Sequence, residues 1–235
     1  MSDSVKFERV KKFLKNHPSE APHQAGTVID VGGISPYFPL LEPLFHPAHL
    51  YLLNHTADLV EGTPSIVASA YQLPFKDETC DIITSFDVLE HLLQPERFVS
   101  EAFRVIRPDG LFILAIANLG DVYSRIAFLF GYTPFQYDPS SCKVGSLSKI
   151  KTTSREHKSV FTYRAVKELL DYYGFQIIWS SGYHYIESFY HLHGLMQKER
   201  GMGFRGLRKI LGAILPTSLS EGMILFCKKK NTLVD

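Results

Sequence analysis

Apolar positions along the chain alternate between short, nearly continuous runs and stretches in which they recur at helical spacing. The continuous runs have the length of buried strands rather than of helices. The expected strands cover residues 27–31, 50–53, 65–68, 81–86, 111–117, 175–181 and 221–228. Strands that alternate with helices at this pitch predict an α/β fold with a doubly wound sheet.

Helical stripes fill several of the intervals between these strands. The stripe of Val5, Val10 and Phe13 predicts an N-terminal amphipathic helix within residues 1–18. The clearest helix begins after Thr162, an N-cap residue, and ends before Gly174. Other stripes are expected at 40–45 and 98–106, and the residues Arg107–Gly110 are expected to turn the chain into the fifth strand.

Two long connections interrupt the regular winding. They cover residues 119–160 and 187–220, and loops of this length in a compact domain usually serve as lids or binding segments. Because the chain has 235 residues, we expect a single domain over 1–235 that carries these two segments as substrate lids.

Composition excludes several classes of protein. A net charge of +1 provides no field to attract nucleic acid, and the longest apolar run, 111–117, is too short to span a membrane. The N-terminus lacks the apolar core of a secretory signal, and Cys80, Cys142 and Cys227 are too widely spaced for a disulfide framework. These features predict a cytoplasmic protein with reduced thiols. The basic and apolar residues of 198–209 fit a solvated lid face better than weak peripheral contact with a membrane.

Three segments carry a resemblance to a known family. VIDVGGISPYF, LPFKDETCDIITSFDVLEHL and AFRVIRPDGLFILAIAN resemble class I S-adenosylmethionine-dependent methyltransferases, in the small-molecule branch of the type 11 and type 25 kind. The resemblance covers 27–178 and is most specific over 73–118. It implies a Rossmann-like seven-stranded sheet of order 3-2-1-4-5-7-6, with the last strand antiparallel, a helical lid, and S-adenosyl-L-methionine as the cofactor.

The same resemblance implies which residues surround the cofactor, at the carboxyl edge of the sheet. Some positions depart from the family pattern: Ile34 and Pro36 replace glycines, Asn54 replaces the carboxylate after strand two, and Ser69 stands where an aspartate often holds the adenine. The glycine motif is therefore degenerate. The implied cofactor-binding residues are Asp30, Gly32, Gly33, Asn54, Ser69, Ala70, Phe86 and Asp87.

Two histidines are candidate catalytic residues. The segment REHKSVFTYRAVKELLDYYGF resembles one that closes the substrate lid in a subset related to glycan and lipid modification, and its histidine is His157. An imidazole takes a proton from a hydroxyl near neutral pH, so His157 is the candidate general base. His91 is a second candidate, with a packing or capping role at a helix start as the alternative. His184, His191 and His193 have no carboxylate or cysteine at ligand spacing, so no metal is expected there.

The sequence thus predicts methyl transfer to an oxygen of a small molecule, a sugar or a lipid-linked intermediate. Because the cofactor motif is degenerate, a second hypothesis stays open: a methyltransferase-fold scaffold or partner-binding protein without catalytic activity. A nicotinamide-dependent oxidoreductase is disfavoured, since the first turn lacks GxGxxG. Neither the acceptor nor the oligomeric state follows from the sequence.

Overall fold

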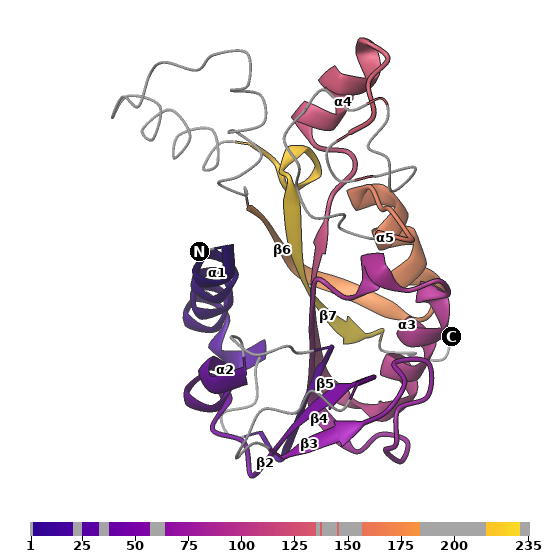
Figure 1. The fold of residues 1–235 in the computed structure, drawn as a ribbon. Helices are drawn as coiled ribbons and strands as arrows, with labels where there is room; N and C mark the ends of the chain where they lie inside the picture. The colour runs from indigo at the N-terminus through magenta and orange to yellow at the C-terminus, as the bar shows by residue number, and fades with distance from the viewer. Residues whose placement is uncertain are drawn as a thin grey trace, which may run out of the picture.

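The architecture is centred on one seven-stranded sheet with strand order β3-β2-β1-β4-β5-β7-β6 (Figure 1). The computed structural model describes residues 2–20, 25–32, 38–56, 64–134, 137, 145, 157–183 and 215–230. The predicted order is confirmed, and β7 is antiparallel to both β5 and β6 as expected. The strands are β1 (Thr27–Val31), β2 (His49–Asn54), β3 (Ser65–Val67), β4 (Cys80–Phe86), β5 (Ile106–Ala117), β6 (Phe175–Tyr183) and β7 (Gly222–Lys229).

The topological switch point lies between β1 and β4. Strand β1 pairs in parallel with β2 on one side and with β4 on the other, so Asp30 lies between Leu52 and Thr84. All residues of β4 are buried, as its continuous apolar pattern predicts for a central parallel strand. In sheets of this kind ligands bind at the carboxyl ends of the strands beside the switch point.

The turn predicted at Arg107–Gly110 is instead an irregular part of β5. Strand β5 begins at Ile106, which pairs with Cys80, and the register then shifts so that Ile82 pairs with Leu111. Pro108 has no N–H to donate to a ladder, which accounts for the interruption of regular pairing. The prediction of a turn that precedes the strand was therefore wrong in its placement, although the break in pairing is real.

The predicted helices are present where the structure describes the chain. The N-cap role of Thr162 is confirmed, because its hydroxyl accepts a hydrogen bond from the Ala165 amide, and Gly174 follows the helix with φ of +86°. The helices are α1 (Ser2–Asn16), α2 (Phe38–Phe45), α3 (Pro95–Val105), α4 (Val122–Leu129) and α5 (Tyr163–Tyr172), with short 3-10 turns η1 (Pro18–Glu20), η2 (Leu89–His91) and η4 (Thr217–Leu219).

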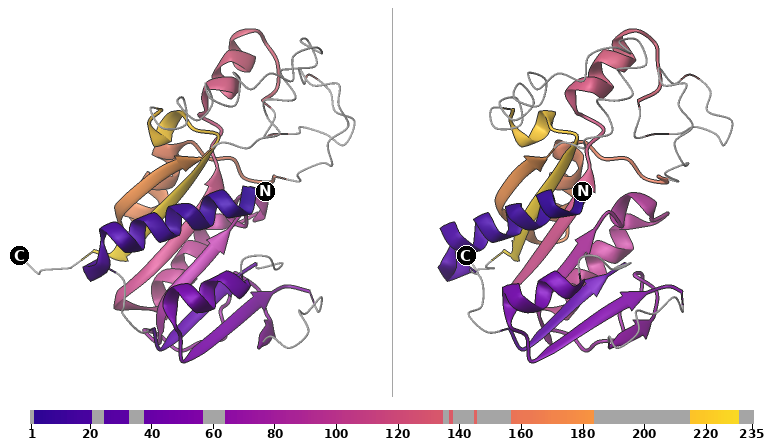
Figure 2. Two further views of the ribbon diagram at one scale, coloured as in Figure 1. Left: turned by 90° about the vertical axis from the view of Figure 1, so that its left-hand side faces the viewer. Right: turned by 60° about the vertical axis from the view of Figure 1, so that its left-hand side comes forward.

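Helices cover both faces of the sheet (Figure 2). Helices α1 and α2 pack on one face, where Phe7, Phe13 and Leu41 join a buried cluster with Phe226 of β7. Helices α3 and α5 pack on the other face and form a second cluster with alternate residues of the same strands, such as Phe112. The alternation follows from the period of two of side chains along a strand. Most of the buried apolar area thus lies in two layers around the sheet.

Much of the two predicted lid segments lies outside the described residues. The first is described through α4 to residue 134, and Asp121 caps α4 by accepting hydrogen bonds from the Tyr123 and Ser124 amides. Of the second, residues 187–214 are outside the described part, and so are His184, His191 and the basic residues of 198–209. Among the described residues, no helix is long and apolar enough to cross a membrane.

Candidate functional site

The turn after β1 is built on Gly32. Its φ is +78°, its N–H donates to the Leu53 carbonyl at 2.7 Å, and a Cβ placed on it would lie 2.3 Å from Val88 Cγ2. Both the left-handed backbone and the close approach of Val88 require glycine at this position. Gly33, together with Ile34 and Pro36, lies outside the described residues.

Asp30 is a buried carboxyl group at the end of β1. Only 1% of the residue is exposed, and Oδ1 accepts a hydrogen bond of 2.7 Å from the Thr84 hydroxyl. Oδ2 is buried and has no hydrogen-bond partner among the described residues. Burial raises the pKa of Asp30 to about 7, and the Thr84 bond offsets part of that effect. A cationic or N–H ligand at this edge would satisfy the second oxygen.

Asp87, at the end of β4, is paired with a lysine from the N-terminal helix. Lys6 is fully buried, forms an ion pair with the Asp87 carboxylate, and lies 5.5 Å from the centroid of the Tyr183 ring. Asp87 has φ of +55°, and its N–H donates to the Ala115 carbonyl. Asp87 keeps a side-chain exposure of 33%, so its carboxylate remains accessible from the edge of the sheet.

This contact of Lys6 was not predicted from the sequence, which indicated only an amphipathic helix at the N-terminus. A signal for it exists in the sequence. Lys6 precedes Val10 by four residues and Phe13 by seven, so the three side chains lie on the same buried face of the helix.

Asn54 and Phe86 are both largely buried. Asn54 Oδ1 accepts a 2.7 Å bond from the His55 amide and lies 3.1 Å from His55 Nδ1, so it is held by its neighbour in the chain. Phe86 is 5% exposed, and its ring is packed against Phe7 of α1 with centroids 6.0 Å apart.

Ser69 and Ala70 form the turn after β3. The Ser69 hydroxyl accepts a 3.2 Å bond from the Tyr71 amide, and Ala70 packs against the buried cluster below α3. The Tyr71 hydroxyl in turn accepts bonds from the Leu93 and Gln94 amides, so this turn is tied to the segment that follows η2.

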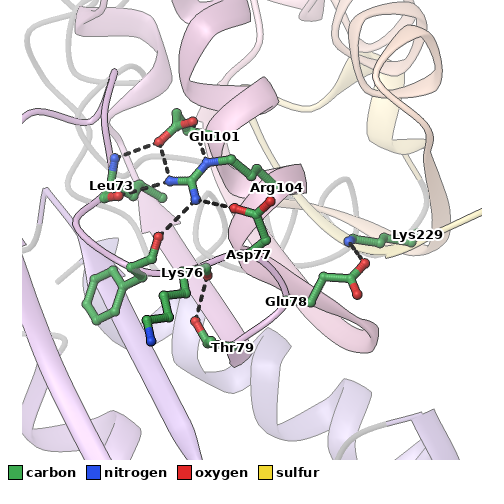
Figure 3. Close-up of polar contacts among 9 residues, drawn as sticks. Leu73, Lys76, Asp77, Glu78, Thr79, Glu101, Arg104 and Lys229 are labelled. Atoms are coloured by element: carbon green, nitrogen blue, oxygen red, sulfur yellow. Dashed lines mark hydrogen bonds and ion pairs between the residues drawn. The ribbon is translucent and has the colours of Figure 1, made fainter.

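Arg104 of α3 fixes the next part of this loop (Figure 3). Its guanidinium donates to the carbonyl oxygens of Leu73 and Phe75 and to the carboxylates of Asp77 and Glu101, at distances of 2.7 to 3.0 Å. The Glu101 carboxylate also accepts a hydrogen bond of 2.8 Å from the Leu73 amide. This network sets the path of residues 73–77 on α3 and therefore the position of the turn that precedes them.

His91 and His157 lie together, although they are far apart in the sequence. Their ring centroids are 5.0 Å apart and the rings meet edge to face. The Lys158 and Ser159 amides both donate to the Glu90 carbonyl, at 2.8 and 3.0 Å, which holds the segment after His157 on η2. The two predicted catalytic residues are thus brought to one place beside the carboxyl end of β4.

Glu90 is a buried carboxyl group next to this pair. It is 2% exposed, Oε1 accepts a 3.3 Å bond from the Ala117 amide, and Oε2 has no hydrogen-bond partner among the described residues. Burial, and then the negative charge of Asp87, raise the pKa of Glu90. The sequence gave no sign that Glu90 is buried.

Asn118 at the end of β5 has a structural role. Its amide nitrogen donates to the carbonyls of Ser218 and Ser220 at 3.1 and 2.7 Å, and its oxygen accepts the Gly120 amide at 2.9 Å. Asn118 therefore ties the start of the first long connection to the segment that leads into β7. Both functional groups of its side chain are used in this way.

Comparison with known proteins relates this arrangement to a family. Residues 48–114 match a family model described as a methyltransferase domain. A probable S-adenosylmethionine-dependent methyltransferase of Mycolicibacterium smegmatis is 45% identical over 47 residues, which are 20% of this chain and 18% of that protein. An uncharacterized methyltransferase of Mycobacteroides abscessus is 36% identical over 100 residues, covering 38% of this chain and 39% of that protein.

The fold extends this similarity beyond the matched segment. The crystal structure of a SAM-dependent methyltransferase from Archaeoglobus fulgidus superposes with a TM-score of 0.58 at 16% identity, over 95% of this chain and 94% of that one. The resemblance to class I S-adenosylmethionine-dependent methyltransferases, and the fold that it implies, are confirmed. The aligned segments span less than half the length of each of the two curated relatives described above.

Proposed function

We propose that the chain binds S-adenosyl-L-methionine and transfers its methyl group to an oxygen of a small-molecule, sugar or lipid-linked acceptor. The observation that carries the proposal is the convergence of Asp30, Asp87 and the His91–His157 pair on the carboxyl edge of the sheet, beside the β1–β4 switch point. That is where this fold binds its ligands.

The residues present fit a cationic nucleoside cofactor. Asp30 Oδ2 is a buried acceptor that lacks a partner among the described residues, and Asp30 lies in β1 two positions before Gly32. Asp87 is a partly exposed carboxylate at the neighbouring strand end. The cofactor supplies an activated methyl group on a sulfonium, so the protein has to bind, orient and exclude water rather than activate the donor. Asp30, Gly32, Gly33 and Asp87 would hold its amino-acid end, and Asn54, Ser69, Ala70 and Phe86 its nucleoside.

The histidine pair supports an acceptor that must lose a proton. A hydroxyl group is a weak nucleophile until a base takes its proton, and an imidazole has the appropriate pKa for this near pH 7. His157 is half-buried and His91 is exposed, so the pair lies between the protein and solvent, where an acceptor would enter. We assign the role of general base to His157 and a supporting role to His91.

A scaffold or partner-binding protein is the second candidate function. The observation that favours it is that two cofactor positions are satisfied by the protein itself, Asp87 by Lys6 and Asn54 by His55. The cofactor has to compete with these contacts for the same groups. The fold alone does not decide between the two candidates.

Transfer of a labelled methyl group tests the catalytic proposal. The protein is incubated with S-adenosylmethionine labelled in its methyl group and with polar and lipid fractions of a cell extract, and each fraction is counted. We expect label in at least one fraction with the wild type and a strong loss with His157→Ala, while S-adenosylhomocysteine still binds to both. Cofactor binding without label in any fraction would favour the scaffold.

A further inference from the structure

Glu90, His91 and His157 form a compact set of metal-ligating side chains. One ligand atom from each residue lies within 4.8 Å of the other two, and the two imidazole rings meet with centroids 5.0 Å apart. Two of the three residues belong to η2, and the third comes from the segment that precedes α5. The set thus joins the end of β4 to the predicted lid.

Backbone hydrogen bonds hold the two segments in this arrangement. The Lys158 and Ser159 amides donate to the Glu90 carbonyl, and the Ser159 hydroxyl donates to the Leu92 carbonyl at 2.8 Å. The position of His157 relative to Glu90 is therefore set by neighbouring main-chain contacts. Preorganised ligands of this kind lose less conformational entropy when an ion binds.

The Glu90 carboxyl group supplies an independent sign of a ligand. It is 2% exposed, and although Oε1 accepts the Ala117 amide, Oε2 is buried and lacks a hydrogen-bond partner among the described residues. Lys6 is close enough to act on it electrostatically, but Lys6 forms its ion pair with Asp87. A buried carboxylate needs a matching cation or a set of hydrogen bonds, and metal coordination is one way to meet this need.

We propose that Glu90, His91 and His157 bind a divalent transition-metal ion, with Zn²⁺ as the ion that suits them best. Two imidazole nitrogens and one carboxylate oxygen are a known ligand set for zinc sites that keep an open coordination position. The open position would accept the acceptor oxygen, and this assignment of substrate chemistry rests on the proposed function. With the ion bound, both histidines act as ligands, so the ion takes over the role that His157 has as a base in the metal-free site. The charge of the ion makes the acceptor hydroxyl more acidic, and its proton leaves to water.

The spacing of these three residues in the sequence does not match a metal-binding motif, so the sequence did not predict this site. Glu90 and His91 are adjacent, and His157 lies on the far side of β5 and α4 in the chain. Only the packing of the 157–159 segment on η2 brings the third ligand into place.

Competition with a chromophoric zinc chelator tests the site on the metal-free chain of 235 residues, with Zn²⁺ alone as the probe. We expect uptake of one Zn²⁺ per chain, and at least roughly tenfold weaker binding in His91→Ala, His157→Ala and Glu90→Gln. His49→Ala is the matched control, because His49 is an exposed histidine at the start of β2. The affinity of this variant for Zn²⁺ should equal that of the wild type. Thermal melting of each variant verifies that it is folded.

The outcomes separate this site from the proposed function. Absence of zinc uptake by the wild type, or equal uptake by the wild type and the three ligand variants, overturns the metal site. Binding of S-adenosylhomocysteine is measured on the same samples by calorimetry. Zinc uptake without nucleoside binding would leave the metal site standing and would contradict the proposed function alone.

Discussion

Lys6 of the N-terminal helix forms an ion pair with Asp87, the residue that follows β4 at the switch point. The contact joins two segments that lie far apart in the chain and fixes α1 against the edge where the proposed cofactor binds. Lys6 is fully buried, whereas Asp87 is partly exposed at the proposed cofactor site. The ion pair therefore affects both the packing of α1 and the charge at that site. It sets how much negative charge Asp87 presents to a ligand.

Removal of that lysine should change the preference between cofactor and product. In Lys6→Met an apolar side chain of similar length replaces the ammonium, so the Asp87 carboxylate is left without its cation. We expect the affinity for the cationic S-adenosylmethionine to rise relative to neutral-sulfur S-adenosylhomocysteine, by roughly two- to fivefold at low salt. Titration calorimetry with both ligands measures the ratio.

Lys11→Met is the control for this experiment, since Lys11 lies on the same helix in an exposed pair with Glu8. Its ratio should match that of the wild type. An unchanged ratio in Lys6→Met would show that Asp87 does not face the sulfonium.

Asp30 should make stability fall as pH rises. Its pKa in the folded protein is about 7, above the ordinary value of 3.8 for an aspartate, so between these values the folded state holds a proton that the unfolded state has lost. The free energy of unfolding therefore decreases from about pH 4 to about pH 7 through this group and changes no further above that range. In Asp30→Asn this contribution is absent, so the difference in stability between the two proteins should shift in favour of the variant across the window. Urea titrations at several pH values test this, and a constant difference would contradict it.

Gly32 should tolerate no side chain. Gly32→Ala combines a left-handed backbone with a Cβ 2.3 Å from Val88, so we expect a loss of roughly 2–4 kcal/mol in the free energy of unfolding. Gly131→Ala separates the two causes, because Gly131 has φ of +74° and nothing within 4 Å of an added Cβ. Gly131→Ala should lower the free energy of unfolding by about 1–2 kcal/mol, which is the backbone strain alone. Equal losses in the two variants would remove the argument for close packing of Val88 on the turn.

Arg104→Lys should loosen the loop that leads from the Ser69 turn into β4. A lysine keeps the charge but loses the planar set of donors that reaches Leu73, Phe75, Asp77 and Glu101 together. We expect a loss of about 1–2 kcal/mol, measured by denaturant unfolding. Arg164→Lys, in an exposed pair with Glu168, should leave the free energy of unfolding essentially unchanged. A loss in Arg104→Lys no larger than in this control would show that the network adds little.

The positions of the strands and helices could be predicted from the sequence, because apolar periodicity and turn residues report local structure. The cap at Thr162 and the buried strand β4 followed from such patterns. The strand order followed from the family resemblance. The ion pair of Lys6 and the burial of Glu90 do not follow from local patterns, since both depend on which distant side chains pack together. The bulge at 107–110 was missed because Pro108 and Gly110 also suit a simple turn.

Binding of S-adenosylhomocysteine tests the central claim most directly, because it needs no knowledge of the acceptor. Calorimetry of the wild-type chain should show saturable binding of one ligand per chain. At a hundredfold excess over the dissociation constant, the ligand should add about 2.7 kcal/mol to the free energy of unfolding. NAD should have no effect. No heat and no thermal shift at millimolar S-adenosylhomocysteine would contradict the proposed methyltransferase activity and leave the scaffold as the explanation of this fold.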